Sequence, residues 1–307
     1  MTIHQYIDVD ASGAIYDGMT AATRTPFWRM HGLGNQILVV DERATGVRLG
    51  SEAARDLGSA PDLGFDQLMS IRDAGVAGVD AEIAIFNRDG STAGACGNGM
   101  RCVGLVAREI LGGDRFLFLV GGQLLRVSVD TAERVVVNMG RPRFDWHDIP
   151  LAEPFADTRY IELQIGPIDN PLLHSPSVVN VGNPHAVFWV DDLHAYDLAA
   201  IGPMLENHPI FPERANISLA QIVSRSHVRV RTWERGAGLT QACGSAACAV
   251  AVCAARTRRL DRSATVSLPG GDLSIMWRDD DTIEMAGPAS HLFAGHLTVG
   301  PGTAVRV

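Results

Sequence analysis

The chain has 307 residues, 46% of them hydrophobic, which is enough apolar material for one large domain or two ordinary ones. Acidic residues outnumber basic ones by 35 to 26, and the formal net charge of −9 argues against a nucleic-acid or anionic-lipid partner. No apolar run is long enough to span a bilayer, and the first residues lack the basic and apolar segments of a secretory signal, so we expect a cytoplasmic protein.

Residues 1–25 are polar and irregular in pattern, and Pro26 ends this N-terminal extension. From Phe27 onward, short β-branched and apolar runs alternate with turn residues, which is typical of a sheet-rich protein. The predicted strands are 37–40, 67–71, 81–86, 115–119, 124–129, 135–139, 160–165, 177–181, 186–190, 217–223, 229–233, 265–267, 273–277 and 282–285. Helical spacing predicts two clear helices, 97–111 and 244–256, and shorter ones near 51–57 and 197–206.

Two segments of the chain echo each other, residues 83–109 and residues 230–256. Each runs from a strand through a Gly-containing loop to Ala-Cys-Gly and then to a helix of small residues. A Gly-Asn pair precedes each cysteine at nearly the same separation, since Asn35 lies 61 residues before Cys96 and Asn183 lies 60 before Cys243. This agreement in register predicts two related halves, with a boundary in the proline-rich stretch 141–154 and a site in the cleft between them.

The basic residues are all arginine, and the absence of lysine excludes two enzyme classes. A pyridoxal phosphate enzyme needs a lysine for its Schiff base, and a phosphate-binding P-loop also needs one. We therefore expect an activity that does not depend on pyridoxal phosphate.

Cys96 and Cys243 are each predicted to begin a helix, where free backbone N–H groups and a partial positive charge stabilise a thiolate. We therefore expect both thiols to be more acidic than a free cysteine. The same amides would hold a substrate carboxylate, and Asn98 and Ser245 suit capping positions at these helix starts.

Two thiols on opposite faces of one carbon can invert its configuration, because one removes a proton while the other returns one. The carbanion between these steps needs electrostatic stabilisation, which the amides around the carboxylate would supply. Cys102, Cys248 and Cys253 lie inside the predicted helices, where cysteine usually serves only to pack.

The chain resembles the diaminopimelate epimerases over about residues 27–307. The motifs that carry the resemblance are FWRMHGLGNQILVVD (27–41), ACGNGMRC (95–102), VGNPHAVFWVDD (181–192) and WERGAGLTQACGSAACA (233–249). Proline-racemase-like relatives share the two cysteines but usually carry a histidine after the first Cys-Gly, where this chain has Asn98.

The resemblance implies a cofactor-independent epimerase that interconverts LL- and meso-diaminopimelate, a precursor of lysine and peptidoglycan, through Cys96 and Cys243. It places the reacting carboxylate at the amides of Gly97, Asn98, Gly244 and Ser245. Asn35 and Gln67 match positions near the reacting amino group. The distal amino-acid end would be recognised by Asn87, Asn183, Asn216, Glu234 and Arg235, of which the last two suit an ammonium and a carboxylate. His185 matches a histidine close to the cysteines that could help move protons, as could Glu234.

The fold that we expect is α+β, with two pseudo-symmetric domains that each wrap a mostly antiparallel, β-barrel-like sheet around a central helix. The resemblance places residues 26–143, joined by 290–307, in the first domain and residues 144–289 in the second. It also implies a homodimer. We expect the domains to close over a small amino-acid substrate, because the carbanion must be shielded from water, and the cysteine spacings give no reason to expect a metal.

Other readings of the two cysteines stay open at this point. The nearest alternative is a racemase for proline or hydroxyproline. The Glu234-Arg235 pair argues against it, because this pair suits a substrate with a second charged end. A dithiol redox or metal-binding protein belongs to another class, and the cysteine spacings do not support it. The chain also departs from the family at Gly94-Ala95, at Leu239, where a glutamate is common, and at Ser245-Ala246, where Thr-Gly is frequent.

Overall fold

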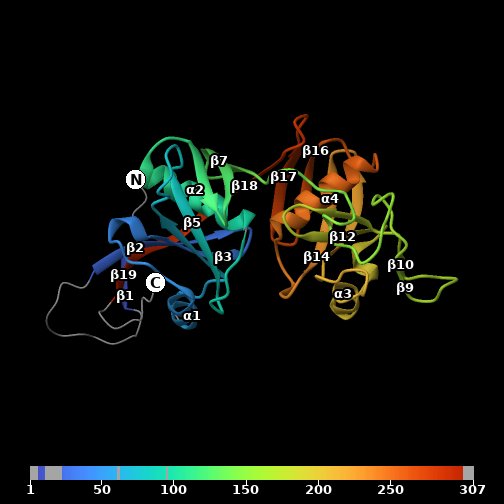
Figure 1. Ribbon diagram of the computed structural model, residues 1–307, viewed down its shortest axis with the longest axis horizontal. Coiled ribbons are helices and arrows are strands. Elements are labelled where there is room, and N and C mark those ends of the chain that lie inside the picture. Colours follow the sequence, from blue (N-terminus) through green and yellow to red (C-terminus); the bar gives the residue numbers. More distant parts are fainter. Residues whose placement is uncertain (1–5, 11–22, 61–62, 95, 300–307) are drawn as a thin grey trace. The chain divides into compact units, whose positions relative to one another are not determined.

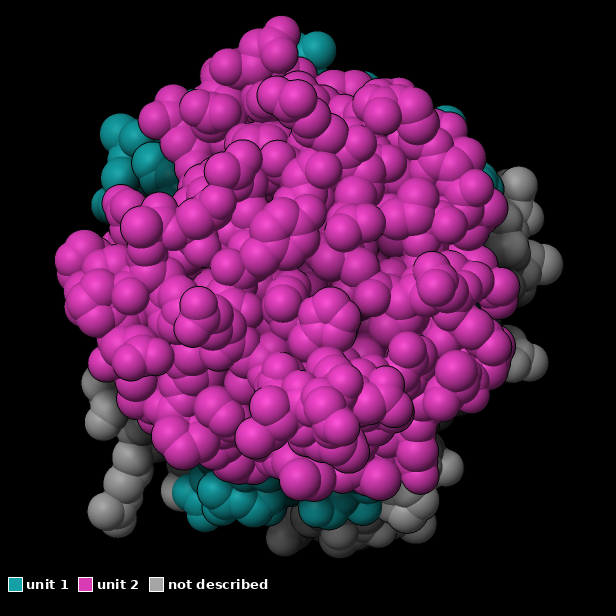
Figure 2. All heavy atoms as spheres, turned by 90° about the vertical axis from the view of Figure 1, so that its right-hand side faces the viewer, with its two compact units in different colours: residues 1–137, 287–307 teal, residues 138–286 magenta. Residues whose placement is uncertain are grey.

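The computed structural model describes residues 6–10, 23–60, 63–94 and 96–299. The chain divides into two compact units, residues 1–137 with 287–307 (unit 1) and residues 138–286 (unit 2), which Figure 2 colours separately. Unit 2 is one continuous piece of chain, whereas unit 1 takes its last strand from the end of the sequence. No helix within the described ranges is long and apolar enough to cross a membrane.

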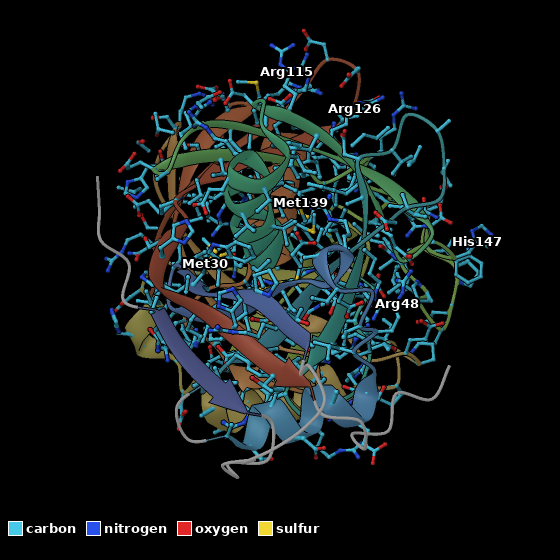
Figure 3. The ribbon with its side chains drawn as sticks, turned by 90° about the vertical axis from the view of Figure 1, so that its left-hand side faces the viewer. Met30, Arg48, Arg115, Arg126, Met139 and His147 are labelled. Atoms are coloured by element: carbon cyan, nitrogen blue, oxygen red, sulfur yellow. The ribbon has the colours of Figure 1, made fainter. Side chains whose placement is uncertain are left out.

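Unit 1 is built on a mixed, mostly antiparallel sheet (Figure 1). Its strands are β1 (Tyr6–Asp10), β2 (Thr23–Gly32), β3 (Asn35–Asp41), β4 (Gln67–Arg72), β5 (Ala81–Asn87), β6 (Arg115–Val120), β7 (Gln123–Thr131), β8 (Arg134–Asn138) and β19 (Ser290–Val299). Its helices are η1 (Glu42–Ala44), α1 (Ser51–Ser59) and α2 (Gly97–Leu111). Helix α2 lies against β2, β3, β4 and β7, and the strands surround it in Figure 3.

Unit 2 repeats this plan. Its strands are β9 (Gln164–Ile165), β10 (Leu173–His174), β11 (Ser177–Asn180), β12 (Pro184–Trp189), β13 (Asn216–Ser224), β14 (His227–Glu234), β15 (Gly238–Leu239), β16 (Ser263–Leu268), β17 (Gly271–Trp277) and β18 (Ile283–Gly287). Its helices are η2 (Leu193–Ala195), α3 (Leu198–Glu206) and α4 (Gly244–Arg256). Ten of the thirteen residues of α4 are buried, which fits its run of small apolar side chains.

The two units pair their strands in the same series. In unit 1, β2–β3 is antiparallel, β3–β4 parallel, β4–β5 antiparallel, β5–β6 parallel, and β6–β7 and β7–β8 antiparallel. Unit 2 follows the same series from β11–β12 through β12–β13, β13–β14, β14–β16 and β16–β17 to β17–β18. In each unit a helix joins the second strand of the series to the third, and the cysteine helix joins the fourth to the fifth. The predicted fold of two pseudo-symmetric α+β domains is confirmed.

Several predicted elements need correction. The segment predicted as irregular contains β1, which pairs in parallel with β19, and β2 begins at Thr23 and continues through Pro26. The predicted strand 160–165 is wrong except at Gln164–Ile165, because Ile161 and Leu163 are buried without joining a sheet ladder. The strand β19 has no counterpart among the predicted elements.

Candidate active site

Cys96 is the N-cap residue of the 15-residue helix α2, with extended backbone angles of φ −151° and ψ 99°. The backbone amide of Gly99 donates to Cys96 Sγ at 3.2 Å, so the thiol sulfur accepts from the first turn of the helix. Asn35 Nδ2 lies 4.0 Å from the same sulfur. A Cβ atom at Gly99 would lie 2.7 Å from Met69 Sδ and 3.3 Å from Cys96 Sγ, so glycine lets Met69 pack against the first turn of the helix beside the thiol.

Asn35, Gln67 and Asn87 lie at the same end of three adjacent strands. The turn Leu33-Gly34, with two positive φ angles, starts β3 at Asn35, and Gln67 pairs with Asn87 in the β4–β5 register. Gln67 Nε2 donates to Asn87 Oδ1 at 3.0 Å, and Asn87 Nδ2 donates to Ser91 Oγ at 3.0 Å. Asn35 Oδ1 and Gln67 Oε1 are buried and accept no hydrogen bond from any described residue. Two buried carbonyl oxygens are therefore available to a donor such as a ligand ammonium.

Cys243 is the N-cap residue of α4, with extended backbone angles of φ −122° and ψ 107°. Cys243 is only 5% exposed, whereas Cys96 is half-buried. Burial raises the pKa of the Cys243 thiol well above its usual value, and the negative charge of Glu234 raises it further. The prediction of a more acidic thiol is therefore wrong for Cys243, because the loss of hydration outweighs the helix N-terminus.

A chain of hydrogen bonds leads from Cys243 into the core of unit 2. Cys243 Sγ lies 3.4 Å from Ser245 Oγ, Asn183 Nδ2 donates to Ser245 Oγ at 3.4 Å, and His185 Nε2 lies 2.8 Å from Asn183 Oδ1. Burial, and secondarily the charge of Arg235, lower the pKa of His185 to about 3. His185 is therefore neutral near pH 7 and, through Nε2–H, orients the Asn183 amide.

Glu234 is the last residue of β14 and Arg235 follows it, and nearby side chains hold them in place. Thr240 Oγ1 donates to Glu234 Oε1, and Asn216 Oδ1 accepts from the backbone amide of Arg235 at 3.0 Å. Burial raises the pKa of Glu234, while hydrogen bonds from Thr240 and Cys243 act in the opposite direction. Arg235 Nη1 donates to the carbonyl oxygen of Glu213 at 2.9 Å.

The structure thus brings the predicted residues together within each unit. Cys96 lies near Asn35, and Gln67 and Asn87 bond one another, while Gly97 and the buried Asn98 form the first turn of α2. In unit 2, Cys243 is joined by Gly244, Ser245, Asn183, His185, Glu234, Arg235 and Asn216. The N-caps are the cysteines themselves, not Asn98 or Ser245 as predicted. Ala95 lies outside the described residues.

Sequence reasoning gave no functional role to Ser91 and Thr240, which hydrogen-bond to Asn87 and Glu234, or to Glu206, which accepts from the Gly236 amide beside Arg235. Their polar side chains carry no spacing signal, although Ser91 and Thr240 lie within six residues of a predicted site residue. Within the described part of the chain, no cluster of His, Cys, Asp or Glu could hold a metal ion.

The arrangement provides, in each unit, a thiol at the start of a helix and polar groups beside it. A thiol can act as acid and a thiolate as base, and the free amides of the helix turn can bind an anion. The buried acceptor oxygens of Asn35 and Gln67 suit an ammonium group, and the Glu234-Arg235 pair offers both charges.

Comparison with known proteins gives consistent matches. A family model described as diaminopimelate epimerase matches residues 27–144 and 177–292. The diaminopimelate epimerase of Brucella anthropi is 55% identical over 283 residues, covering 92% of this chain and 94% of the relative. That of Afipia carboxidovorans is 55% identical over 273 residues, covering 88% and 94%.

Solved structures show the same fold at low sequence identity. A predicted epimerase from Pseudomonas aeruginosa superposes with a TM-score of 0.64 at 17% identity, covering 91% of this chain and all of that one. A hydroxyproline epimerase from Agrobacterium vitis, with bound trans-4-hydroxy-L-proline, gives a TM-score of 0.61 at 12% identity, covering 94% and 97%.

Proposed function

Because the chain belongs to the diaminopimelate epimerase family, we propose that it interconverts LL- and meso-diaminopimelate by moving an α-proton between Cys96 and Cys243. The observation that carries the proposal is the placement of both cysteines as N-caps of the central helices of two units with the same strand pairing. The identity of about 55% to diaminopimelate epimerases over most of the chain supports the substrate.

In the proposed reaction, the two thiols approach opposite faces of the α-carbon. One sulfur, as thiolate, takes the α-proton, and the C–H electron pair delocalises into the carboxylate. The other sulfur, as thiol, returns its own proton to the opposite face, so the two sulfurs end with exchanged protonation states. The backbone amides of Gly97, Asn98, Gly244 and Ser245 would hold the carboxylate and stabilise its added charge.

The remaining residues would bind the rest of the substrate. We assign the reacting ammonium to Asn35 and Gln67, whose carbonyl oxygens lack partners among the described residues. The distal zwitterion is assigned to Asn87, Asn183, Asn216, Glu234 and Arg235. His185 is neutral near pH 7 and would act by orienting Asn183. The lysine-free sequence cannot form a pyridoxal imine, so the proposed carbanion depends on these electrostatic contacts.

A racemase for proline or hydroxyproline is not favoured. The hydroxyproline epimerase of known structure is only 12% identical, whereas the diaminopimelate epimerases are 55% identical. A cytoplasmic homodimer is part of the proposal on the strength of the family resemblance, and light scattering after size exclusion would test the dimer.

Deuterium exchange tests the proposed function. The purified protein would be incubated in D₂O with LL-diaminopimelate, a thiol reductant and no added cofactor, and followed by NMR. We expect meso product with deuterium at the α-carbon from the wild type, and no epimerisation by Cys96→Ala or Cys243→Ala. Cys253→Ala, which changes a buried cysteine in the interior of α4, is the matched control and keeps the activity. No exchange by the wild type contradicts the assigned substrate, and proline and hydroxyproline would then be tried.

A further inference from the structure

Glu206, the last residue of α3, has a buried carboxylate that the proposed reaction does not use. The residue is 5% exposed and accepts hydrogen bonds from three groups. Trp233 Nε1 donates to Oε2 at 2.7 Å, while the backbone amide of Gly236 at 2.9 Å and Arg214 Nη1 at 3.1 Å both donate to Oε1. A buried carboxylate with three donors is a fixed point to which other groups can be anchored.

The donors lie on both sides of the site residues. Trp233 immediately precedes Glu234-Arg235, and Gly236 immediately follows. Gly236 has a φ of +76°, so the chain turns there in a conformation that favours glycine. Glu206 therefore binds both ends of this turn, Trp233 and Gly236, and the turn carries Glu234 and Arg235 between them.

Helix α3 is shaped to receive this turn. Gly202 lies four residues before Glu206, so the two share one face of the helix. A Cβ atom at Gly202 would lie 2.5 Å from Cδ2 of the Trp233 indole. The indole therefore lies directly on the helix backbone, where its Nε1 reaches the carboxylate.

Unit 1 holds the equivalent turn with the equivalent helix but different groups. Helix α1 joins β3 to β4 as α3 joins β12 to β13, and the turn after Asn87 corresponds to the turn after Glu234. Arg88 Nε donates to the carbonyl oxygen of Gly58 at 2.8 Å, and Arg55 Nε donates to that of Asp89 at 3.1 Å. In both units the helix is therefore hydrogen-bonded to the turn, although the side chains that make the bonds are unrelated. This repetition indicates that the contact between helix and turn is not incidental packing.

We infer that Glu206 is a positioning residue, which acts through Trp233 and Gly236 to aim Glu234 and Arg235 at the distal end of the substrate. The inference rests on the proposed function for the identity of that substrate. Its first step, the anchoring of the turn, is independent of the function and can be measured without substrate.

Glu206→Gln is the main test, since an amide has one acceptor oxygen and would turn its NH₂ group either toward Trp233 Nε1 or toward the Gly236 amide and Arg214. We expect the KM for LL-diaminopimelate to rise about tenfold or more, with kcat within about threefold of the wild type. Hydrogen exchange at the Gly236 amide should become about tenfold faster, because its acceptor is lost or weakened. Glu153→Gln, at an exposed glutamate of the same unit, is the control and should change none of these values.

Trp233→Phe is the second variant, and it removes the Nε1 donor, together with part of the ring that packs against Gly202, while the Gly236 contact stays. A smaller rise in KM than in Glu206→Gln, with kcat again retained, supports the inference. A fall in kcat that matches the loss of folded protein, with KM unchanged in both variants, overturns it and leaves Glu206 a purely structural role. If the wild type does not turn over diaminopimelate, the proposed function fails, whereas unchanged exchange at Gly236 in Glu206→Gln overturns the anchoring alone.

Discussion

The imidazole of His185 is fully buried, and its pKa of about 3 makes the folded state sensitive to acid. In the unfolded chain the imidazole has a pKa of about 6.5, so between about pH 6.5 and 3 the unfolded state binds a proton that the folded state does not. The free energy of unfolding therefore falls as the pH is lowered through this window. This group alone should remove about 2–3 kcal/mol between about pH 7.5 and pH 4.5.

Urea unfolding at these two pH values tests the contribution of His185. His185→Gln cannot titrate, so its loss of stability between the two pH values should be smaller than that of the wild type by about 2–3 kcal/mol. His174→Gln, at an exposed histidine of the same unit, should show the wild-type dependence. An equal acid loss in His185→Gln and the wild type would contradict the assignment.

The two site thiols differ in burial, and alkylation should distinguish them. Cys96 is half-buried, whereas Cys243 is 5% exposed and has a raised pKa. Iodoacetamide at neutral pH should therefore modify Cys96 before Cys243, as read by peptide mass spectrometry. Glu234→Gln removes a negative charge that raises the pKa of Cys243, so it should shift the pH dependence of Cys243 alkylation to lower pH. Faster reaction of Cys243 than of Cys96 in the wild type would contradict this reading.

At the residue scale, the sequence predicted which residues meet but not all of their properties. The paired Ala-Cys-Gly motifs predicted both cysteines at helix starts, because a helix begins where small polar and glycine residues precede a helical run. The raised pKa of Cys243 depends on burial and on Glu234, which become neighbours only in the folded chain. The contacts of Glu206 with Trp233 and Gly236 span about 30 residues and leave no periodic trace in the sequence.

Among the elements, α2 approaches the sheet closely because of Gly104. A Cβ atom there would lie 2.6 Å from Val127 Cγ1 on β7 and 3.3 Å from Val135 Cγ1 on β8. Helix propensity alone predicts that Gly104→Ala stabilises the protein by about 1 kcal/mol, whereas overpacking costs about 1–3 kcal/mol. We expect the clash to prevail and the free energy of unfolding to fall, because β-branched valines repack poorly.

Urea unfolding of Gly104→Ala and Gly104→Val measures this balance. The larger valine side chain should destabilise the protein more than alanine does. A Gly104→Ala variant as stable as the wild type or more so would show that the sheet yields and that propensity decides.

The helices α2 and α4 have the bounds that the sequence predicted, since their spacing and their starting motifs agree. The long strands β2 and β19 were missed for reasons of tertiary structure. Pro26 suggested a break, yet it lies inside β2 opposite His296 of β19. At 160–165 a strand was predicted where most of the segment forms none. Its alternating apolar residues pack into the core of unit 2 without joining a sheet ladder.

For the whole molecule, the internal echo in the sequence predicted two related units, and the common series of strand pairings confirms it. The sequence could not show that β1 adds to the sheet of unit 1, because a short polar strand is specified by its partner. The way in which unit 1 is closed, by β19 against β2, also depends on residues at opposite ends of the chain.

A chain that ends at Ala286 tests the role of β19. Its loss would leave β2 paired only with β3, and it would remove Pro288, whose carbonyl oxygen accepts from Arg101 Nε at 3.0 Å. We expect amide protection of β2 and β3 to be lost in hydrogen exchange, while α4 and its sheet in unit 2 keep theirs as the internal reference. Wild-type protection of β2 in the shortened chain would contradict the prediction.

The discontinuity of unit 1 also sets the order in which a newly made molecule can mature. The ribosome makes β2 about 260 residues before β19, which at ~5–20 residues per second is a delay of tens of seconds. During that delay the unit that carries Cys96 has an unpaired strand edge, which can pair with other chains and aggregate. All of unit 2 is made before β19. Translation that stops early therefore yields no partly active enzyme, because the unit made first is the last to be completed.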